Sequence, residues 1–85
     1  MTHDAAREEF LRGARLKIEG QRMMAQGQDA MERGAWMAVD AGERKVDIPT
    51  MLAGWVGDDQ VHLLGISEHS VSRWLSPRNR ERVLP

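Results

Sequence analysis

Residues 65–75 read Gly-Ile-Ser-Glu-His-Ser-Val-Ser-Arg-Trp-Leu and predict a tight turn followed by a short helix. Gly65 follows an apolar pair, and glycine takes the left-handed conformation that ends many helices without strain. Ser67 is placed to cap the next helix by accepting a hydrogen bond from a free amide, and Glu68 adds negative charge at the positive end of that helix. Pro77 ends the helix because it disfavours a helical conformation at Ser76.

The helix predicted over residues 68–75 has two different faces. Val71, Trp74 and Leu75 follow the i, i+3, i+4 spacing of one buried stripe. The opposite face repeats that spacing with polar side chains only: His69, Ser72, Arg73 and Ser76. Such side chains suit a DNA major groove, where arginine pairs with guanine and small hydroxyls approach base edges. The alternative is an ordinary solvated helix, although serine is a poorer helix former than the residues that stability alone would favour there.

Leu63-Leu64-Gly65-Ile66-Ser67, followed by Val71-Ser72-Arg73-Trp74-Leu75, resembles the helix-turn-helix of bacterial and phage transcriptional regulators. Those families write the stretch as L-G-I-S-x-x-T-V-S-R-W-L, and this chain has Ser70 in place of the threonine. The resemblance implies that Ile66, Val71 and Trp74 hold the helix in place. It also implies that the side chains facing DNA are Ser67, Glu68, His69, Ser72 and Arg73. Val61 departs from the pattern, because those families usually place a small residue where the two helices cross.

Two further helices are predicted before this turn, over Pro49–Val56 and Asp59–Leu64, because proline favours a first helical turn and Asp58 follows the breaker Gly57. With Glu68–Leu75 they form a small tri-helical head. Its expected core consists of Leu52, Ala53, Val56, Val61, Leu64, Ile66, Val71, Trp74 and Leu75. This core is small, so we expect the N-terminal half to pack onto the head, through Trp36 or Val39.

The N-terminal half contains glycines at intervals of seven residues: Gly13, Gly20, Gly27 and Gly34. Seven residues are close to two helical turns, so these glycines lie along one strip of a helix. Four interior glycines cost roughly 4 kcal/mol relative to alanine, and close approach of another backbone would explain them. We therefore expect one helix over about residues 2–40. The alternative is a break at Gly20 or Gly27 that folds two shorter helices back on each other.

The simplest partner for the glycine strip is a second copy of the chain, since two-fold homodimers are the commonest oligomers. The predicted dimer interface consists of Gly13, Leu16, Gly20, Met23, Met24, Gly27, Met31 and Gly34. The expected organisation is all-α, with a long N-terminal helix, or helical hairpin, over residues 1–42. The helix-turn-helix head with a basic C-terminal tail covers residues 46–85.

Composition restricts the function further. The 85 residues include no cysteine, carry a net charge of −1, and show neither a membrane-spanning apolar run nor a signal-peptide pattern, so we expect a cytoplasmic protein without membrane contact. From His69 onward there are four arginines and one acid, a basic end that suits phosphate contact. The predicted DNA-binding residues are Ser67, Glu68, His69, Ser70, Ser72, Arg73, Ser76, Arg78, Arg80 and Arg82. For Arg80 and Arg82, a solubilising terminal segment explains the charge equally well.

No enzyme, metal site or cofactor is expected. The three histidines His3, His62 and His69 lack ligand spacing, and the adjacent acids Asp58 and Asp59 are typical of a helix start. The sequence thus predicts a bacterial or phage DNA-binding regulator, or an accessory DNA-binding factor, that acts as a homodimer on double-stranded DNA. The competing prediction is a helical protein-interaction module that clasps a partner protein along the glycine and methionine seam.

Overall fold

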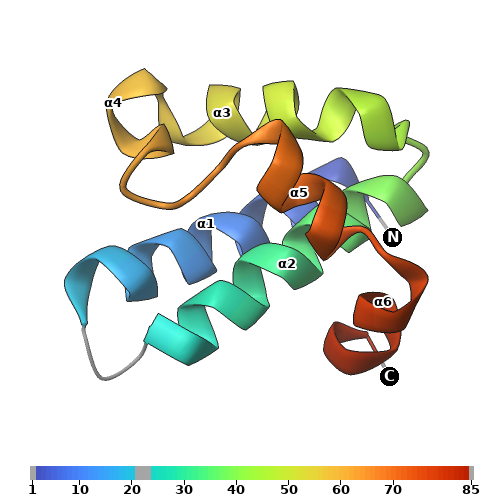
Figure 1. The fold of residues 1–85 in the computed structure, drawn as a ribbon, viewed down its shortest axis with the longest axis horizontal. Coiled ribbons are helices and arrows are strands. Elements are labelled where there is room, and N and C mark those ends of the chain that lie inside the picture. Colours follow the sequence, from blue (N-terminus) through green and yellow to red (C-terminus); the bar gives the residue numbers. More distant parts are fainter. Residues whose placement is uncertain (1, 21–23, 85) are drawn as a thin grey trace.

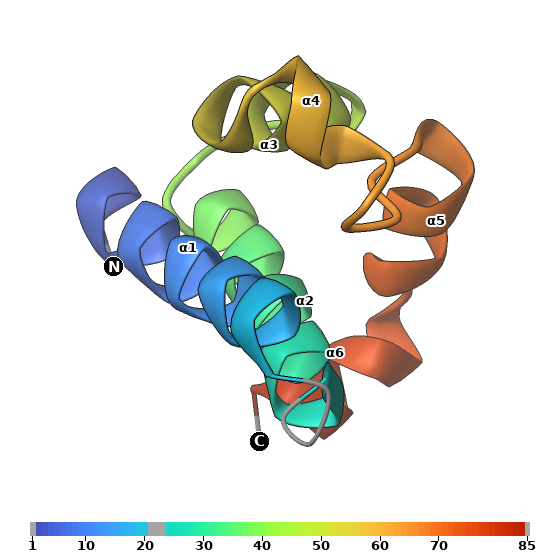
Figure 2. The same ribbon diagram turned by 90° about the vertical axis from the view of Figure 1, so that its left-hand side faces the viewer.

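The computed structural model describes residues 2–20 and 24–84 (Figure 1). All regular secondary structure in these residues is helical, which confirms the predicted all-α fold. Two long helices, α1 (His3–Glu19) and α2 (Met24–Asp40), form an antiparallel hairpin. They are followed by the 3-10 helix η2 (Lys45–Asp47) and by α3 (Ile48–Val56), α4 (Asp58–Val61), α5 (Glu68–Trp74) and α6 (Pro77–Val83). Figure 2 shows α3 and α4 over one side of the hairpin and α5 and α6 along a second side. Within the described residues, no helix combines the length and the apolar character needed to cross a membrane.

The expectation of one unbroken N-terminal helix is wrong, and the hairpin left open by the sequence is what forms. The Gly20 amide donates to the Leu16 carbonyl at 3.0 Å and ends α1. Gly20 itself is extended, with φ −140° and ψ 109°, so the chain leaves the helix axis at this residue. At the other end of α1 the Thr2 hydroxyl accepts a hydrogen bond from the Ala5 amide at 3.1 Å, which caps the helix.

The remaining glycines of the series allow α1 and α2 to approach each other closely. A Cβ at Gly34 would lie 2.6 Å from the amide nitrogen of Phe10, and one at Gly27 would lie 2.7 Å from the carbonyl oxygen of Gly13. A Cβ at Gly13 would meet the Gly27 carbonyl oxygen at a distance no side chain tolerates. The predicted reason for these glycines, close approach of another backbone, therefore holds, but the second backbone belongs to the same chain.

The prediction that the glycine strip packs against a second copy of the chain is consequently wrong. Gly13, Gly27, Met31 and Gly34 are buried within one chain and present no surface to a second copy. Leu16, in the last turn of α1, and Gly20, which caps that helix, are half-buried. Met24 begins α2, and Met23 lies outside the described residues. The same burial removes this seam as the surface with which an interaction module would clasp a partner protein.

The head helices lie close to their predicted positions and share one core with the hairpin. α3 matches the predicted Pro49–Val56, and α5 matches the predicted Glu68–Leu75, whereas α4 covers only Asp58–Val61 before the chain turns toward Gly65. The largest fully buried side chains come from both halves: Phe10, Met31, Ile48, Leu52, Leu64, Val71 and Val83. Of the predicted head core, Ala53, Val56 and Val61 are only half-buried. Trp36 is buried against the head, as predicted.

The C-terminal segment is a helix and not the predicted tail. Ser76 caps α6 by accepting a hydrogen bond from the Asn79 amide at 3.3 Å, and Pro77 occupies its first turn, where no amide hydrogen is needed. Val83 is 1% exposed and anchors α6 in the core. Pro77 thus ends α5 and begins the next helix.

Candidate nucleic-acid interface

The turn before α5 has the geometry that its sequence predicts. Gly65 has φ +68°, in the left-handed region. Its amide donates to the His62 carbonyl at 3.2 Å, and the Ile66 amide donates to the Val61 carbonyl at 3.0 Å. These two bonds form a Schellman motif, which satisfies the last carbonyls of the preceding turn. Ser67 then accepts a hydrogen bond from the Ser70 amide at 3.1 Å, so the predicted cap of α5 is confirmed.

The inner side of α5 is fixed by apolar packing and by two hydrogen bonds. Val71 is fully buried, and Trp74 is 8% exposed. The Trp74 carbonyl accepts from Trp36 Nε1 at 2.8 Å and from Asn79 Nδ2 at 2.7 Å. Because one donor comes from α2 and the other from α6, both neighbouring helices hold the C-terminal end of α5. Nothing local in the sequence marks Asn79 of α6 as a partner of α5, so this residue is absent from the predicted site.

The outer side of α5 presents the predicted polar face to solvent. The exposed residues are Ser67, Glu68, His69, Ser72 and Arg73. Figure 2 shows α5 at the edge of the molecule, away from α1. Ser70 and Ser76 are half-buried, and the Ser76 hydroxyl is occupied as the cap of α6. The prediction that Ser76 faces DNA is therefore wrong, because its hydroxyl caps α6.

Two of the four predicted C-terminal arginines are held by acids of α2. Arg80 Nη2 lies 2.7 Å from Asp40 Oδ2, and its guanidinium is 5.8 Å from the centre of the Trp36 ring. Arg82 Nη1 lies 2.5 Å from Asp29 Oδ1, and its Nη2 lies 2.9 Å from Glu32 Oε1. The hydrogen bond from Arg82 to Asp29 is the main reason why the pKa of this guanidinium is raised. The prediction that these two arginines contact phosphate is corrected accordingly: they attach α6 to α2.

Arg73 and Arg78 remain as exposed arginines near the end of α5. Neither takes part in an ion pair with any residue in the described parts of the chain. Arg73 lies in the last turn of α5, and Arg78 lies in the first turn of α6. The basic character predicted for the C-terminal region is therefore concentrated in two side chains that flank the bend between these helices.

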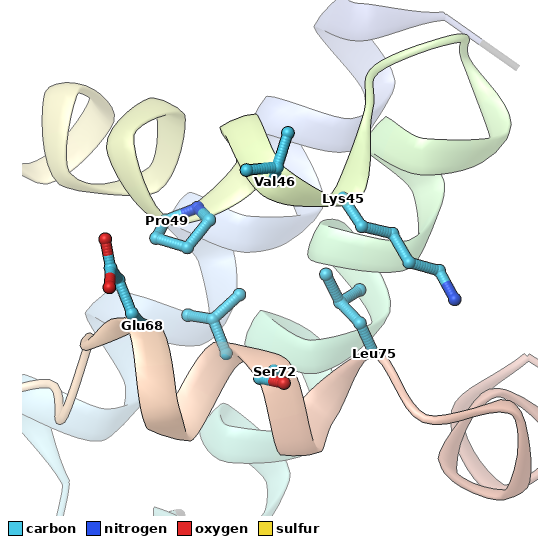
Figure 3. A pocket seen from close by; sticks show the side chains of 7 residues that line it. Lys45, Val46, Pro49, Glu68, Ser72 and Leu75 are labelled. Atoms are coloured by element: carbon cyan, nitrogen blue, oxygen red, sulfur yellow. The ribbon is translucent and has the colours of Figure 1, made fainter.

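An open groove of about 550 Å³ runs along one side of α5 (Figure 3). Pro49 and Val46 form one wall, and Val71 and Ser72 of α5 form the other together with Leu75, which directly follows that helix (Figure 3). Lys45 and Glu68 lie toward opposite ends of the groove in Figure 3. Lys45 Nζ also lies 4.9 Å from the centre of the Trp36 ring.

A half-buried lysine supports the turn from beneath. Lys17 Nζ donates to the Leu64 carbonyl at 3.2 Å and to Gln28 Oε1 at 2.5 Å. Desolvation lowers the pKa of this ammonium, and the charge of Glu32 opposes that shift. Leu64 directly precedes Gly65, so Lys17 of α1 places a positive charge beside a carbonyl group at the end of the preceding helical turn. The link spans 47 residues of sequence and has no local signal.

Residues 2–20 and 24–84 contain no group of three His, Cys, Asp or Glu side chains arranged to hold a metal ion. Comparison of the chain with protein families, with characterised proteins and with solved structures finds no match.

Proposed function

We propose that this protein binds double-stranded DNA sequence-specifically, with α5 in the major groove. The observation that carries the proposal is the division of α5 into a buried side, Val71 and Trp74, and an exposed side of hydroxyl, imidazole and guanidinium groups. A helix that enters the groove needs such a face, and it also needs fixed support from behind. The Gly65 turn, the Ser67 cap and the two hydrogen bonds to the Trp74 carbonyl supply that support.

Each exposed group has an expected role. Arg73 is the best donor for a base edge, because guanidinium pairs with the O6 and N7 atoms of guanine. Ser72 and His69 lie on the same face and would contact neighbouring bases. Arg78 lies just beyond the bend and would contact a phosphate, which fixes register without reading sequence. Occupation of a DNA site in this way suits a transcription regulator or an accessory factor that shapes DNA.

The proposal is tested by selecting bound sequences from a random DNA pool and measuring affinity for the selected site by fluorescence anisotropy. Arg73→Ala is expected to cost about 1–3 kcal/mol of binding free energy and to relax the preference at one base position. Arg7→Ala, at an exposed arginine of α1, is the matched control and should leave affinity unchanged. Arg73→Ala with unchanged affinity and preference would refute the assignment of α5.

The salt dependence separates this function from protein binding. Retention of DNA at low salt that weakens toward physiological salt supports the proposal, because phosphate contacts release counterions. A folded protein that retains no DNA from the pool even at low salt contradicts it and favours a protein partner.

A further inference from the structure

A second groove, of about 290 Å³, lies between α1 and α3. We call it the α1–α3 groove, and its apolar lining consists of Leu11, Ala14, Ile18, Trp55 and Val56. Trp55 packs against the buried Phe10 ring, with 5.7 Å between the ring centres. The Trp55 side of the groove is therefore continuous with the hydrophobic core. Ile18 stands at its edge with 53% of its surface exposed. The groove therefore combines an apolar hollow with an apolar projection on one surface.

Opposite charges flank Ile18 on α1. Arg15 and Glu19 line the same groove, are both exposed, and are one helical turn apart. Neither forms an ion pair with another residue of the described ranges 2–20 and 24–84. A two-fold axis that brings α1 antiparallel to its symmetry mate reverses the order of the two charges. Arg15 of each copy then faces Glu19 of the other, and the two exposed Ile18 side chains lie near each other across the axis.

Gln60 adds an unsatisfied acceptor at this place. Gln60 lines the α1–α3 groove, and its Oε1 atom is buried and accepts no hydrogen bond from any described residue. Buried polar groups in folded proteins normally have a partner.

We propose that the α1–α3 groove is the interface of a symmetric homodimer. The order of Arg15 and Glu19 along α1 meets one requirement of a two-fold interface, which is that the charges of one patch complement themselves. A small chain with a modest core also gains stability from covering such a face. The glycine seam is closed within each chain, so this interface replaces the one expected from the sequence. The inference is independent of DNA binding.

The test is sedimentation or light scattering of the full chain without DNA, over a range of micromolar concentrations. The wild type is expected to dimerise. Arg15→Glu and Glu19→Arg should each raise the dimer dissociation constant about tenfold, because each reversal creates like-charge contacts on both sides of the two-fold axis. The double variant R15E/E19R should restore dimerisation, since the pairs re-form with exchanged signs.

Two further variants complete the design. Glu81→Arg, at an exposed position of α6, is the charge-reversal control and should leave the dissociation constant unchanged. Ile18→Ser should weaken the dimer without altering charge. Circular dichroism checks that each variant keeps the helical content of the wild type. A wild type that stays monomeric, single reversals without effect, or a folded double variant no better than the singles would each overturn the interface. DNA retention by monomeric variants is measured separately and tests only the proposed function.

Discussion

Replacing Gly34 by alanine should destabilise the protein, although alanine is the better helix former. The added Cβ would lie 2.6 Å from the amide nitrogen, 2.7 Å from the Cβ and 2.8 Å from the Cα of Phe10. Ordinary van der Waals contact begins at 3.4 Å. All three contacted atoms belong to the backbone of α1 or to its first side-chain atom, so no rotamer change relieves the overlap. The two helices must separate along their seam.

The size of the effect follows from two opposing contributions. Alanine at an interior helical position gains about 1 kcal/mol over glycine. Overpacking a well-packed site costs typically 1–3 kcal/mol, and a collision with backbone belongs at the upper end, so the net loss is about 2 kcal/mol. For a domain of this size that loss lowers the melting temperature by about 8–16 °C.

Gly54→Ala is the matched control, because Gly54 is also interior to a helix but no atom of the described residues lies within 4 Å of its added Cβ. It should stabilise the protein by about 0.5–1 kcal/mol. Thermal and urea unfolding of the two variants therefore should shift in opposite directions. The Gly34→Ala loss should also be independent of protein concentration, since the seam lies within one chain. A neutral or stabilising Gly34→Ala, or a loss that disappears at high concentration, would refute the intramolecular seam.

Two other predictions concern charges. Burial desolvates the Glu9 carboxylate, but hydrogen bonds from Arg12 and Arg33 outweigh that effect and lower the pKa of Glu9 below 4.5. The ionised carboxylate therefore stabilises the fold above pH 4.5, and this contribution is lost as the pH falls through the folded-state pKa. Glu9→Gln should therefore cost about 1–2 kcal/mol at neutral pH, with the difference from wild type shrinking in acid urea titrations; a pH-independent difference would contradict the ion pair. Arg78→Ala should reduce the slope of log affinity against log salt by about 0.9, whereas Arg82→Ala should leave it unchanged; equal reductions would show that Arg82 leaves its acids to contact DNA.

The turn and the faces of α5 were predictable because their causes are local. Gly65 adopts a left-handed conformation that other residues avoid, and Ser67 bonds to an amide three residues away. The alternation of apolar and polar positions from Val71 to Leu75 then determines which side is buried. Each of these features depends on a few adjacent residues, which is the range over which a single sequence carries information.

The partner of the glycine strip was not predictable in the same way. A glycine series indicates that a backbone approaches closely, but it does not indicate whose backbone it is. Intramolecular closure needs only a break at Gly20, and it avoids the translational entropy that a second copy would lose. The ion pairs of Arg80 and Arg82 were missed for a related reason, because their acids lie 40 to 53 residues earlier in the chain. A cluster of arginines resembles a phosphate-binding segment until such long-range partners are known.

The pairing of those arginines limits how the proposed DNA complex can gain affinity. If Arg78 supplies the phosphate contact of one chain, the salt slope is about −0.9, and affinity falls only about threefold between 50 and 200 mM salt. Nonspecific binding would then be weak, as a net charge of −1 also implies. Specific binding must instead come from base contacts of α5 and from the joining of two recognition helices. The α1–α3 groove would join two chains along α1. Figure 2 shows α1 away from α5, so such a dimer would leave both recognition faces uncovered.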